Sequence, residues 1–224
     1  MKFKAFTASL ALSAGVAIAA PAAAQVQGNI ALVNTPAAVA QTQAFQAAYQ
    51  QIATTYQTQR NTIQERQQQQ QTLLQQLDTN SDGNLDENEQ RAAQGTPQAQ
   101  QYAQIEQEIA GLQNQIDRAR VYAVEQILRQ YGTTVQQLVT QDNVAVLLSP
   151  ESVLYAQQGA DITPKVVTAL NTALPTVQIA PPTDWQPSRQ AIGVFQQIQQ
   201  LLMAAAQQQA AQQQPPQTTG DSRM

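Results

Sequence analysis

Apolar side chains recur at alternating steps of four and three residues along two stretches of this chain, which are separated by a polar segment. Over residues 45–77, seven of the ten positions at this spacing are apolar, and over residues 102–123 all seven are. This period predicts two helices that pack along a coiled-coil seam. Gln59, Arg66 and Gln70 interrupt the first seam, so we expect looser packing in its middle.

A Thr-Pro pair precedes each predicted helix, at residues 35–36, 96–97 and 163–164. Threonine can cap a helix N-terminus, and proline fits its first turn. The pairs predict helices from 36 to 77, from 97 to about 140 and from 163 to about 173. The first two, each about 40 residues and about 60 Å long, predict an antiparallel helical hairpin over residues 37–140.

Short apolar runs flank the hairpin and predict a small β body made of residues 25–36 and 141–175. Strands are expected at 27–34, 143–149 and 152–156. The predicted fold class is therefore mostly α with a small β body, from which a long antiparallel coiled-coil hairpin emerges. The strands contain too few apolar residues to bury a core in one chain, which favours self-assembly.

The composition changes after residue 175. Residues 176–211 are predicted to form a proline-containing linker and a short amphipathic helix, with Ile192, Phe195, Ile198 and Leu202 on one side. We expect this side to pack on the protein's own body. Residues 212–224 are too polar to pack and are predicted to be disordered.

Residues 1–24 have the pattern of a secretory signal peptide, with Lys2 and Lys4, an apolar run, and small residues before cleavage after Ala24. The alternative is a membrane anchor, but the run is shorter than the ~20 residues that span a bilayer. No later stretch is apolar enough to span one. We therefore expect an exported protein with no transmembrane segment and at most peripheral contact with the cell envelope.

The composition also narrows the chemistry, because the chain has no histidine and no cysteine. These absences exclude histidine bases, thiol nucleophiles and Cys/His zinc sites. An enzyme that uses paired carboxylates or a lysine stays open, but no acid pair stands at a spacing that differs from solvated helix charges, so we expect no enzyme activity. Cleavage would reduce the 11 basic residues to nine against 15 acidic residues, which gives a net charge of −6. Phosphate binding requires clustered lysine and arginine, so we expect no nucleic-acid partner.

Residues 78–89 match the EF-hand loop, with oxygen-bearing side chains at positions 1, 3, 5 and 9, glycine at position 6 and glutamate at position 12. We predict a Ca²⁺ site formed by Asp78, Asn80, Asp82, Asn84, Asp86 and Glu89. Asn84 would contribute its backbone carbonyl, and Glu89 both carboxylate oxygens. The alternative is a polar turn that only caps two helices. A single loop at the hairpin reversal favours a structural clip over a sensor.

Several segments resemble the Skp (OmpH-like) family of periplasmic chaperones of Gram-negative bacteria. They are the signal peptide, IALVNTPAAVA at 30–40, the hairpin, NVAVLLSPESVLYA at 143–156 and DITPKVVTALN at 161–171. The resemblance covers about residues 28–174. It implies a trimer whose β body joins three chains and whose arms hold unfolded outer-membrane proteins without ATP. The EF-hand-like loop and the segment after Pro175 lie outside the family pattern.

On this resemblance we expect a periplasmic holdase that binds unfolded outer-membrane β-barrel proteins between the arms of a homotrimer. Aromatic arm residues are candidates for client binding: Phe45, Tyr49, Tyr56 and Tyr102. Trimerisation is expected to involve apolar residues of the body: Ile30, Leu32, Val144, Val146, Leu147 and Val153. The alternative is a calcium-dependent structural or adaptor coiled coil of the cell envelope that holds no client.

Overall fold

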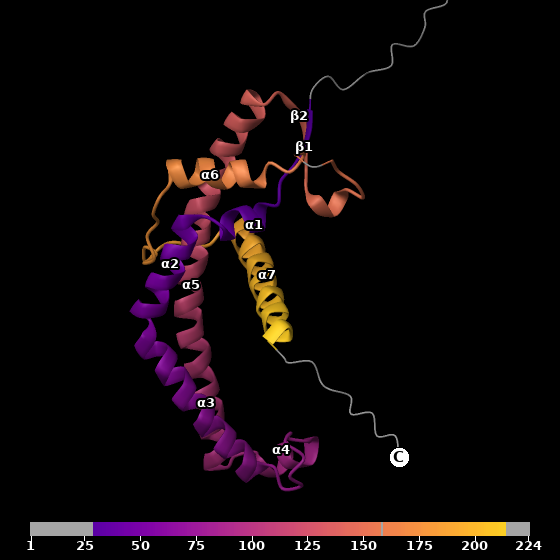
Figure 1. Cartoon of the computed structure of the whole chain (residues 1–224). Helices are drawn as coiled ribbons and strands as arrows, with labels where there is room; N and C mark the ends of the chain where they lie inside the picture. Colours follow the sequence, from indigo (N-terminus) through magenta and orange to yellow (C-terminus); the bar gives the residue numbers. More distant parts are fainter. Residues whose placement is uncertain (1–28, 158, 214–224) are drawn as a thin grey trace, which may run out of the picture.

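A long helical hairpin extends from a body in which a two-stranded sheet lies to one side of several helices (Figure 1). The computed structural model describes residues 29–157 and 159–213, so the predicted signal peptide and the tail beyond Gln213 lie outside the described residues. The elements in chain order are β1 Asn29–Leu32, α1 Thr35–Ala40, α2 Gln43–Thr55, α3 Gln57–Leu77, α4 Glu87–Ala93, α5 Pro97–Gln141, β2 Val144–Leu148, the 3-10 turn η1 Pro150–Ser152, α6 Thr163–Ala173 and α7 Arg189–Gln213. This order confirms the predicted class, mostly α with a small β component.

The first limb of the hairpin consists of α1, α2 and α3 rather than the one helix predicted. α1 begins after Asn34, whose Oδ1 accepts a hydrogen bond from the Ala37 amide at 2.9 Å. α2 has a cap of its own, because the buried Thr42 hydroxyl accepts a hydrogen bond from the Phe45 amide at 3.2 Å. A further break at Tyr56 separates α2 from α3. The helical period of the sequence continues through both breaks and therefore did not reveal them.

One of the three Thr-Pro pairs caps its helix as predicted. At the start of α5, the Thr96 hydroxyl accepts a hydrogen bond from the Ala99 amide at 3.2 Å. Thr35 instead shares a hydrogen bond with the Tyr131 hydroxyl at 2.8 Å, because Asn34 occupies the capping position. α6 begins at the threonine of the third pair, which does not cap it; the Thr163 amide instead donates to Asp161 Oδ1 at 2.8 Å.

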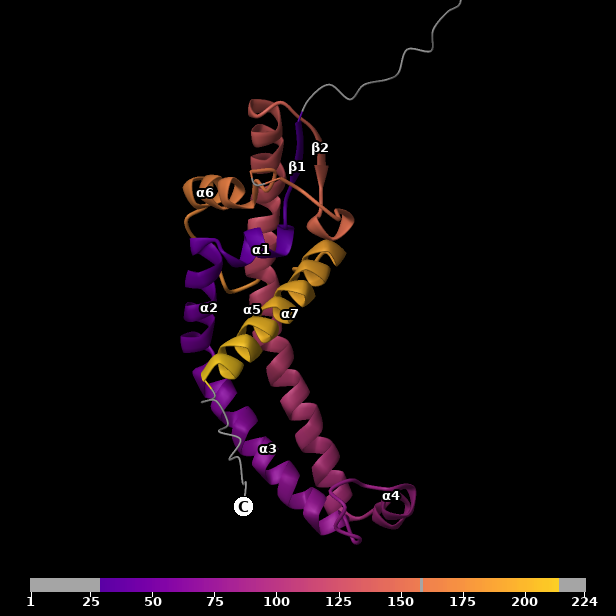
Figure 2. The same ribbon diagram turned by 45° about the vertical axis from the view of Figure 1, so that its right-hand side comes forward.

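The second limb is α5, a single helix of 45 residues and therefore about 68 Å long. It continues through Gly132, so this glycine does not break the helix. Both views show α2 and α3 running alongside α5 (Figures 1 and 2). The seam between the limbs buries a set of aliphatic side chains: Ile52, Ile63, Leu73, Ile105, Ile109 and Ile116. The predicted coiled-coil hairpin is confirmed.

Polar residues loosen this seam where the sequence predicted. Gln59 places its Oε1 in the interior, with no hydrogen-bond partner among the described residues. Arg66 Nε lies 2.9 Å from Glu108 Oε2, close enough for an ion pair between the limbs but not aligned as a hydrogen bond. Because this pair is about one-third exposed, solvent screens it and it contributes little to stability.

The sheet pairs β1 with β2 in parallel, with Asn29 opposite Val144 and Leu32 opposite Leu148. The opposite edge of β1 pairs with a later segment. There the Leu32 amide donates to the Ala160 carbonyl at 2.7 Å, and the Ile162 amide donates to the Leu32 carbonyl at 2.9 Å. Three segments distant in sequence therefore meet at Leu32.

The strand predicted over residues 152–156 is wrong for this chain. After β2 the backbone enters the turn η1, and the residues that follow extend away from the sheet. Leu154 and Tyr155 are 108% and 82% exposed. Residues 160–162 occupy the edge of β1 instead, and residues 152–156 pair with no strand in the described part of the chain.

Helices rather than strands build the core of the body. Its most deeply buried side chains come from α1, α5, α6 and α7: Val39, Val124, Ile127, Val166, Leu170 and Ile198. The expectation that one chain cannot bury a core is therefore wrong, because it counted the strands alone. The need to complete a core is therefore no longer a reason to expect a trimer.

The linker and α7 wrap around the upper part of α5 (Figure 2). Gln126 exchanges hydrogen bonds with the backbone of Gln178, at 2.8 and 3.1 Å. Arg118 donates to the Trp185 carbonyl at 3.0 Å and lies over the Trp185 ring. α7 then packs on α1 and α5, which confirms that the amphipathic helix docks on its own body. It extends to Gln213, so the first two residues of the predicted disordered tail are helical.

Candidate functional site

The loop at the hairpin tip links α3 to α4 and contains all six residues predicted to bind calcium. Asp78 begins it and accepts hydrogen bonds from the amides of Asp82 at 3.2 Å and Gly83 at 2.7 Å. Gly83 has a φ of +84°, a conformation that favours glycine over other residues. The position-6 glycine of the motif therefore has the role in the turn that the sequence predicted.

Glu89 closes the loop from the other end. Its Oε1 accepts hydrogen bonds from the amides of Thr79 at 2.7 Å and Asn80 at 3.0 Å, and its Oε2 accepts one from Asp86 at 3.2 Å. Asp86 in turn caps α4, so the two acids form a capping box. The hydrogen bond from the Asn80 amide is the largest effect on the pKa of Glu89, which is lowered. This carboxylate is therefore ionised at neutral pH.

The donor set of this loop fits a hard cation such as Ca²⁺, because every predicted ligand offers oxygen. In the described conformation, however, the carboxylates of Asp78 and Glu89 face backbone amides. No group of three or more acidic side chains in the described ranges is placed to hold a metal ion. Calcium binding at this loop therefore stays a prediction.

The aromatic residues proposed to bind clients contribute to packing within the chain. Phe45 is only 4% exposed and stacks on Tyr49, with ring centroids 4.0 Å apart. The Tyr49 hydroxyl lies 3.5 Å from Gln199 of α7, within hydrogen-bond reach. Burial raises the pKa of Tyr49 to about 12, while the charge of the nearby Arg120 opposes the rise. Tyr56 and Tyr102 are half-buried against the seam.

The large apolar side chains that are exposed in the described ranges lie in two places. One set is in the body: Ile30, Leu154 and Tyr155. The other set is on α7: Ile192, Leu201, Leu202 and Met203. The helical period predicted Leu202 on the docked side of the helix, and it did not indicate Leu201 or Met203 as exposed apolar residues. The sequence did contain a signal for this exposure, because three consecutive apolar residues cannot all lie on one face of a helix.

The residues predicted to join three chains are unevenly exposed. Ile30 is 58% exposed and Leu32 is buried against its own chain. The remaining four are half-buried: Val144, Val146, Leu147 and Val153. Of the six, Ile30 offers the largest free apolar surface, and the unpredicted Leu154 and Tyr155 offer more.

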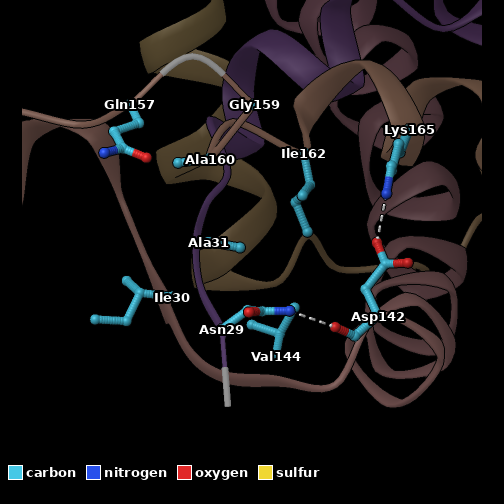
Figure 3. A pocket seen from close by; sticks show the side chains of 10 residues that line it. All are labelled: Asn29, Ile30, Ala31, Asp142, Val144, Gln157, Gly159, Ala160, Ile162 and Lys165. Atoms are coloured by element: carbon cyan, nitrogen blue, oxygen red, sulfur yellow. Dashed lines mark hydrogen bonds and ion pairs between the residues drawn. The ribbon is translucent and has the colours of Figure 1, made fainter.

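A trough of about 480 Å³ lies beside β1 in the body (Figure 3). Lys165 donates to Asp142 Oδ2 at 2.7 Å at its rim, and Asn29 donates to the Asp142 carbonyl at 3.0 Å. The lysine is thus engaged within the chain, and the rest of the lining is uncharged. The trough has no arrangement of acid, base and nucleophile that would indicate catalysis.

Comparison with protein-family models identifies the family to which this chain belongs. A family model described as outer membrane protein (OmpH-like) matches residues 29–170. The chain belongs to the OmpH-like family. The match includes β1, both limbs of the hairpin, the tip loop and β2, and it ends within α6. The linker and α7 lie outside the part of the chain that the OmpH-like model matches.

A solved structure of an OmpH-like outer membrane chaperone from Caulobacter crescentus resembles this chain. The sequences are 19% identical, and the alignment covers 72% of this chain and 92% of the other, with a TM-score of 0.42. A comparison with curated protein sequences gave no match. Membership of the OmpH-like family supports the chaperone role that the resemblance implied.

Proposed function

We propose that this protein is an ATP-independent holdase that binds unfolded outer-membrane β-barrel proteins in the periplasm. The observation that carries the proposal is the OmpH-like match, which spans both the body and the complete hairpin. The predicted signal peptide supports export. No helix in the described part of the chain is long and apolar enough to cross a bilayer.

The charge of the arm determines how a client would be held. Between residues 37 and 140, six arginines face ten acidic residues, five of which lie in the tip loop. Outside the loop the arm therefore has a net charge of +1. With so little charge, client capture depends on apolar contact and on glutamine hydrogen bonds, and it should change little with salt.

The decisive experiment measures light scattering while an unfolded outer-membrane barrel protein is diluted from denaturant. The holdase should suppress aggregation at equimolar amounts without nucleotide, and equally at low and high salt. If the protein leaves aggregation unchanged, the holdase proposal fails. A structural or adaptor coiled coil would then be the better interpretation.

The holdase is proposed to act as a homotrimer joined through the body. Supporting observations are the exposed apolar side chains Ile30, Leu154 and Tyr155, because folded monomers rarely leave large apolar side chains uncovered in one region. Residues 152–156 have strand-like composition but no strand partner among residues 29–157 and 159–213. A neighbouring chain could supply that partner.

Sedimentation analysis tests this assembly. The unmodified protein should sediment as a trimer at micromolar concentration. Replacing Leu154 and Tyr155 with serine should shift it toward the monomer, while the same change at the exposed Gln136 and Gln137 should not. A stable, folded monomer for the unmodified protein would contradict the trimer.

The tip loop is proposed to bind Ca²⁺ as a structural clip. Five acidic residues lie within twelve positions, and they repel one another unless a cation or backbone amides offset their charge. A bound ion would fix the reversal between α3 and α4 and so the angle of the arm tip. The body is about 60 Å away by helix rise, so trimer formation should not depend on it.

Calorimetric titration with Ca²⁺ separates the clip from a purely polar turn. Glu89→Gln should weaken binding strongly, because it removes the carboxylate expected to bind through two oxygens. Glu87→Gln is the matched control, since it removes the same charge from a position that the motif does not use as a ligand. If Ca²⁺ up to several millimolar releases no heat and does not protect the amides of the loop from hydrogen exchange, the loop is a polar turn that binds no calcium.

A further inference from the structure

We propose that the C-terminal half of α7 is the surface that holds the apolar segments of an unfolded outer-membrane protein. The surface consists of Leu201, Leu202 and Met203, which are 42%, 42% and 59% exposed. It lies outside the region that the OmpH-like family model matches. The inference rests on the proposed holdase function and assigns the client contact to particular residues.

The arm helices offer little apolar surface for this task. In the described ranges, none of the large exposed apolar side chains belongs to α2, α3 or α5. Their buried isoleucines and leucines lie between the limbs or in the core of the body, and Phe45 and Tyr49 pack together under α7. What the hairpin presents to solvent is mainly glutamine. A client that is held by apolar contact must therefore find it elsewhere on the chain.

The first half of α7 fixes the position of the second. Ala191, Val194 and Ile198 are buried in the core of the body, at helical steps of three and four. Before the helix begins, the Ser188 amide donates to Glu125 Oε2 at 3.1 Å. Leu202 follows Ile198 by four residues and so continues the same stripe. The stripe thus extends beyond the surface that the described part of the chain covers, on a helix whose first half is held in place by the body.

The charge of α7 identifies the class of partner. From Gln190 to Gln213 the helix has no acidic or basic residue, in a chain that otherwise carries 15 acids. A charged peptide or a nucleic acid would find no complementary group there. The lipid-facing residues of outer-membrane strands are apolar and uncharged, and they are uncovered while the barrel is unfolded. The two surfaces are complementary in charge and polarity.

The residue types on this surface suit varied clients. Methionine is unbranched and flexible, so it adapts to irregular partners, and promiscuous binding surfaces often contain it. The flanking alanines and glutamines keep the helix intact without adding shape requirements. The surface can therefore accept many apolar sequences without selecting one.

The test compares two triple variants of the full chain. In the first, Leu201, Leu202 and Met203 are replaced with glutamine; in the control, the next three residues, Ala204, Ala205 and Ala206, are replaced with glutamine. Both variants gain three glutamines on one exposed helix, but only the first loses large apolar side chains. Affinity for a fluorescently labelled, unfolded outer-membrane barrel protein should fall at least about tenfold in the first variant and less than about twofold in the control.

Four results decide the inference. A photo-reactive residue at Met203 of the otherwise unmodified chain should cross-link to the client, which tests the contact without disrupting the helix. The inference alone is overturned if the first variant binds the client as tightly as the unmodified chain. It is also overturned if the sedimenting mass of the first variant changes, because a second copy of the chain would then occupy this surface. Failure of the unmodified chain to bind any client would overturn the proposed function as well.

Discussion

Replacing Ile198 with alanine tests whether α7 is an integral part of the folded body. Ile198 is 0% exposed and belongs to the same core as Val124 and Leu170, which come from two other helices. The substitution removes three carbon atoms from a site enclosed by packed helices. Substitutions of this kind cost about 2–5 kcal/mol, and the rigid surroundings place the expected loss near 3 kcal/mol.

The single tryptophan provides the assay. Trp185 is buried just before α7, against Tyr122 and beneath Arg118, so its fluorescence reports on this part of the body. Urea unfolding should be followed by this signal and by circular dichroism at one fixed protein concentration, because assembly would make stability depend on concentration. Ile198→Ala should lower the midpoint of both signals without changing the slope.

Met203→Ala is the matched control, since it shortens an apolar side chain on the same helix that is mostly exposed. Its expected cost is below about 1 kcal/mol. The reasoning is refuted if the two variants differ by less than about 0.5 kcal/mol, because a side chain without contact with solvent would then contribute no more than an exposed one.

Two further predictions concern the arm. Gln59→Leu should raise the free energy of unfolding by about 1 kcal/mol, because it removes a buried oxygen without a hydrogen-bond partner and completes the apolar seam. The control Gln64→Leu, on the exposed side of α3, should change the free energy of unfolding by less than about 0.5 kcal/mol. Equal effects of the two substitutions would contradict the proposed cost of the buried oxygen. Burial raises the pKa of Tyr49 from 10.0 to about 12, so the folded state retains the proton more tightly than the unfolded state. Stability should therefore be complete below about pH 10 and decline as the pH rises toward 12, and Tyr49→Phe should reduce that decline in urea midpoints measured across this range. Burial also raises the pKa of Tyr131, so part of the decline in stability should persist in the Tyr49→Phe variant. A decline as large as that of the unmodified protein would contradict the role of Tyr49.

The elements that the sequence predicted well are those whose signals are local. A seam with a period of seven specifies a pair of helices wherever it occurs, and the limbs of the hairpin follow from it. β1 and β2 were found because short runs of branched apolar residues favour extended backbone. The tip loop was located because acidic and amide side chains surround a glycine that adopts positive φ. In each case the deciding residues are neighbours along the chain.

The errors concern choices between local options of similar energy. Residues 152–156 have strand propensity, but the free edge of β1 pairs with residues 160–162. Thr35 could cap α1, but Asn34 does so, and the Thr35 hydroxyl bonds Tyr131, which is 96 residues away. Tyr49 has the spacing of a seam residue, and only the position of α7 determines that its hydroxyl is covered. Propensity alone could not rank these alternatives.

The sequence alone therefore determined the helical hairpin, the two short strands, the candidate calcium loop and the absence of histidine and cysteine chemistry. The tertiary structure decided that α7 closes the core of the body and that three large apolar side chains in the middle of this helix are left uncovered by the described residues. The physical reason is that periodicity shows which side of a helix is apolar. How far along the helix that side is covered depends on the length and placement of elements that lie far away in the chain.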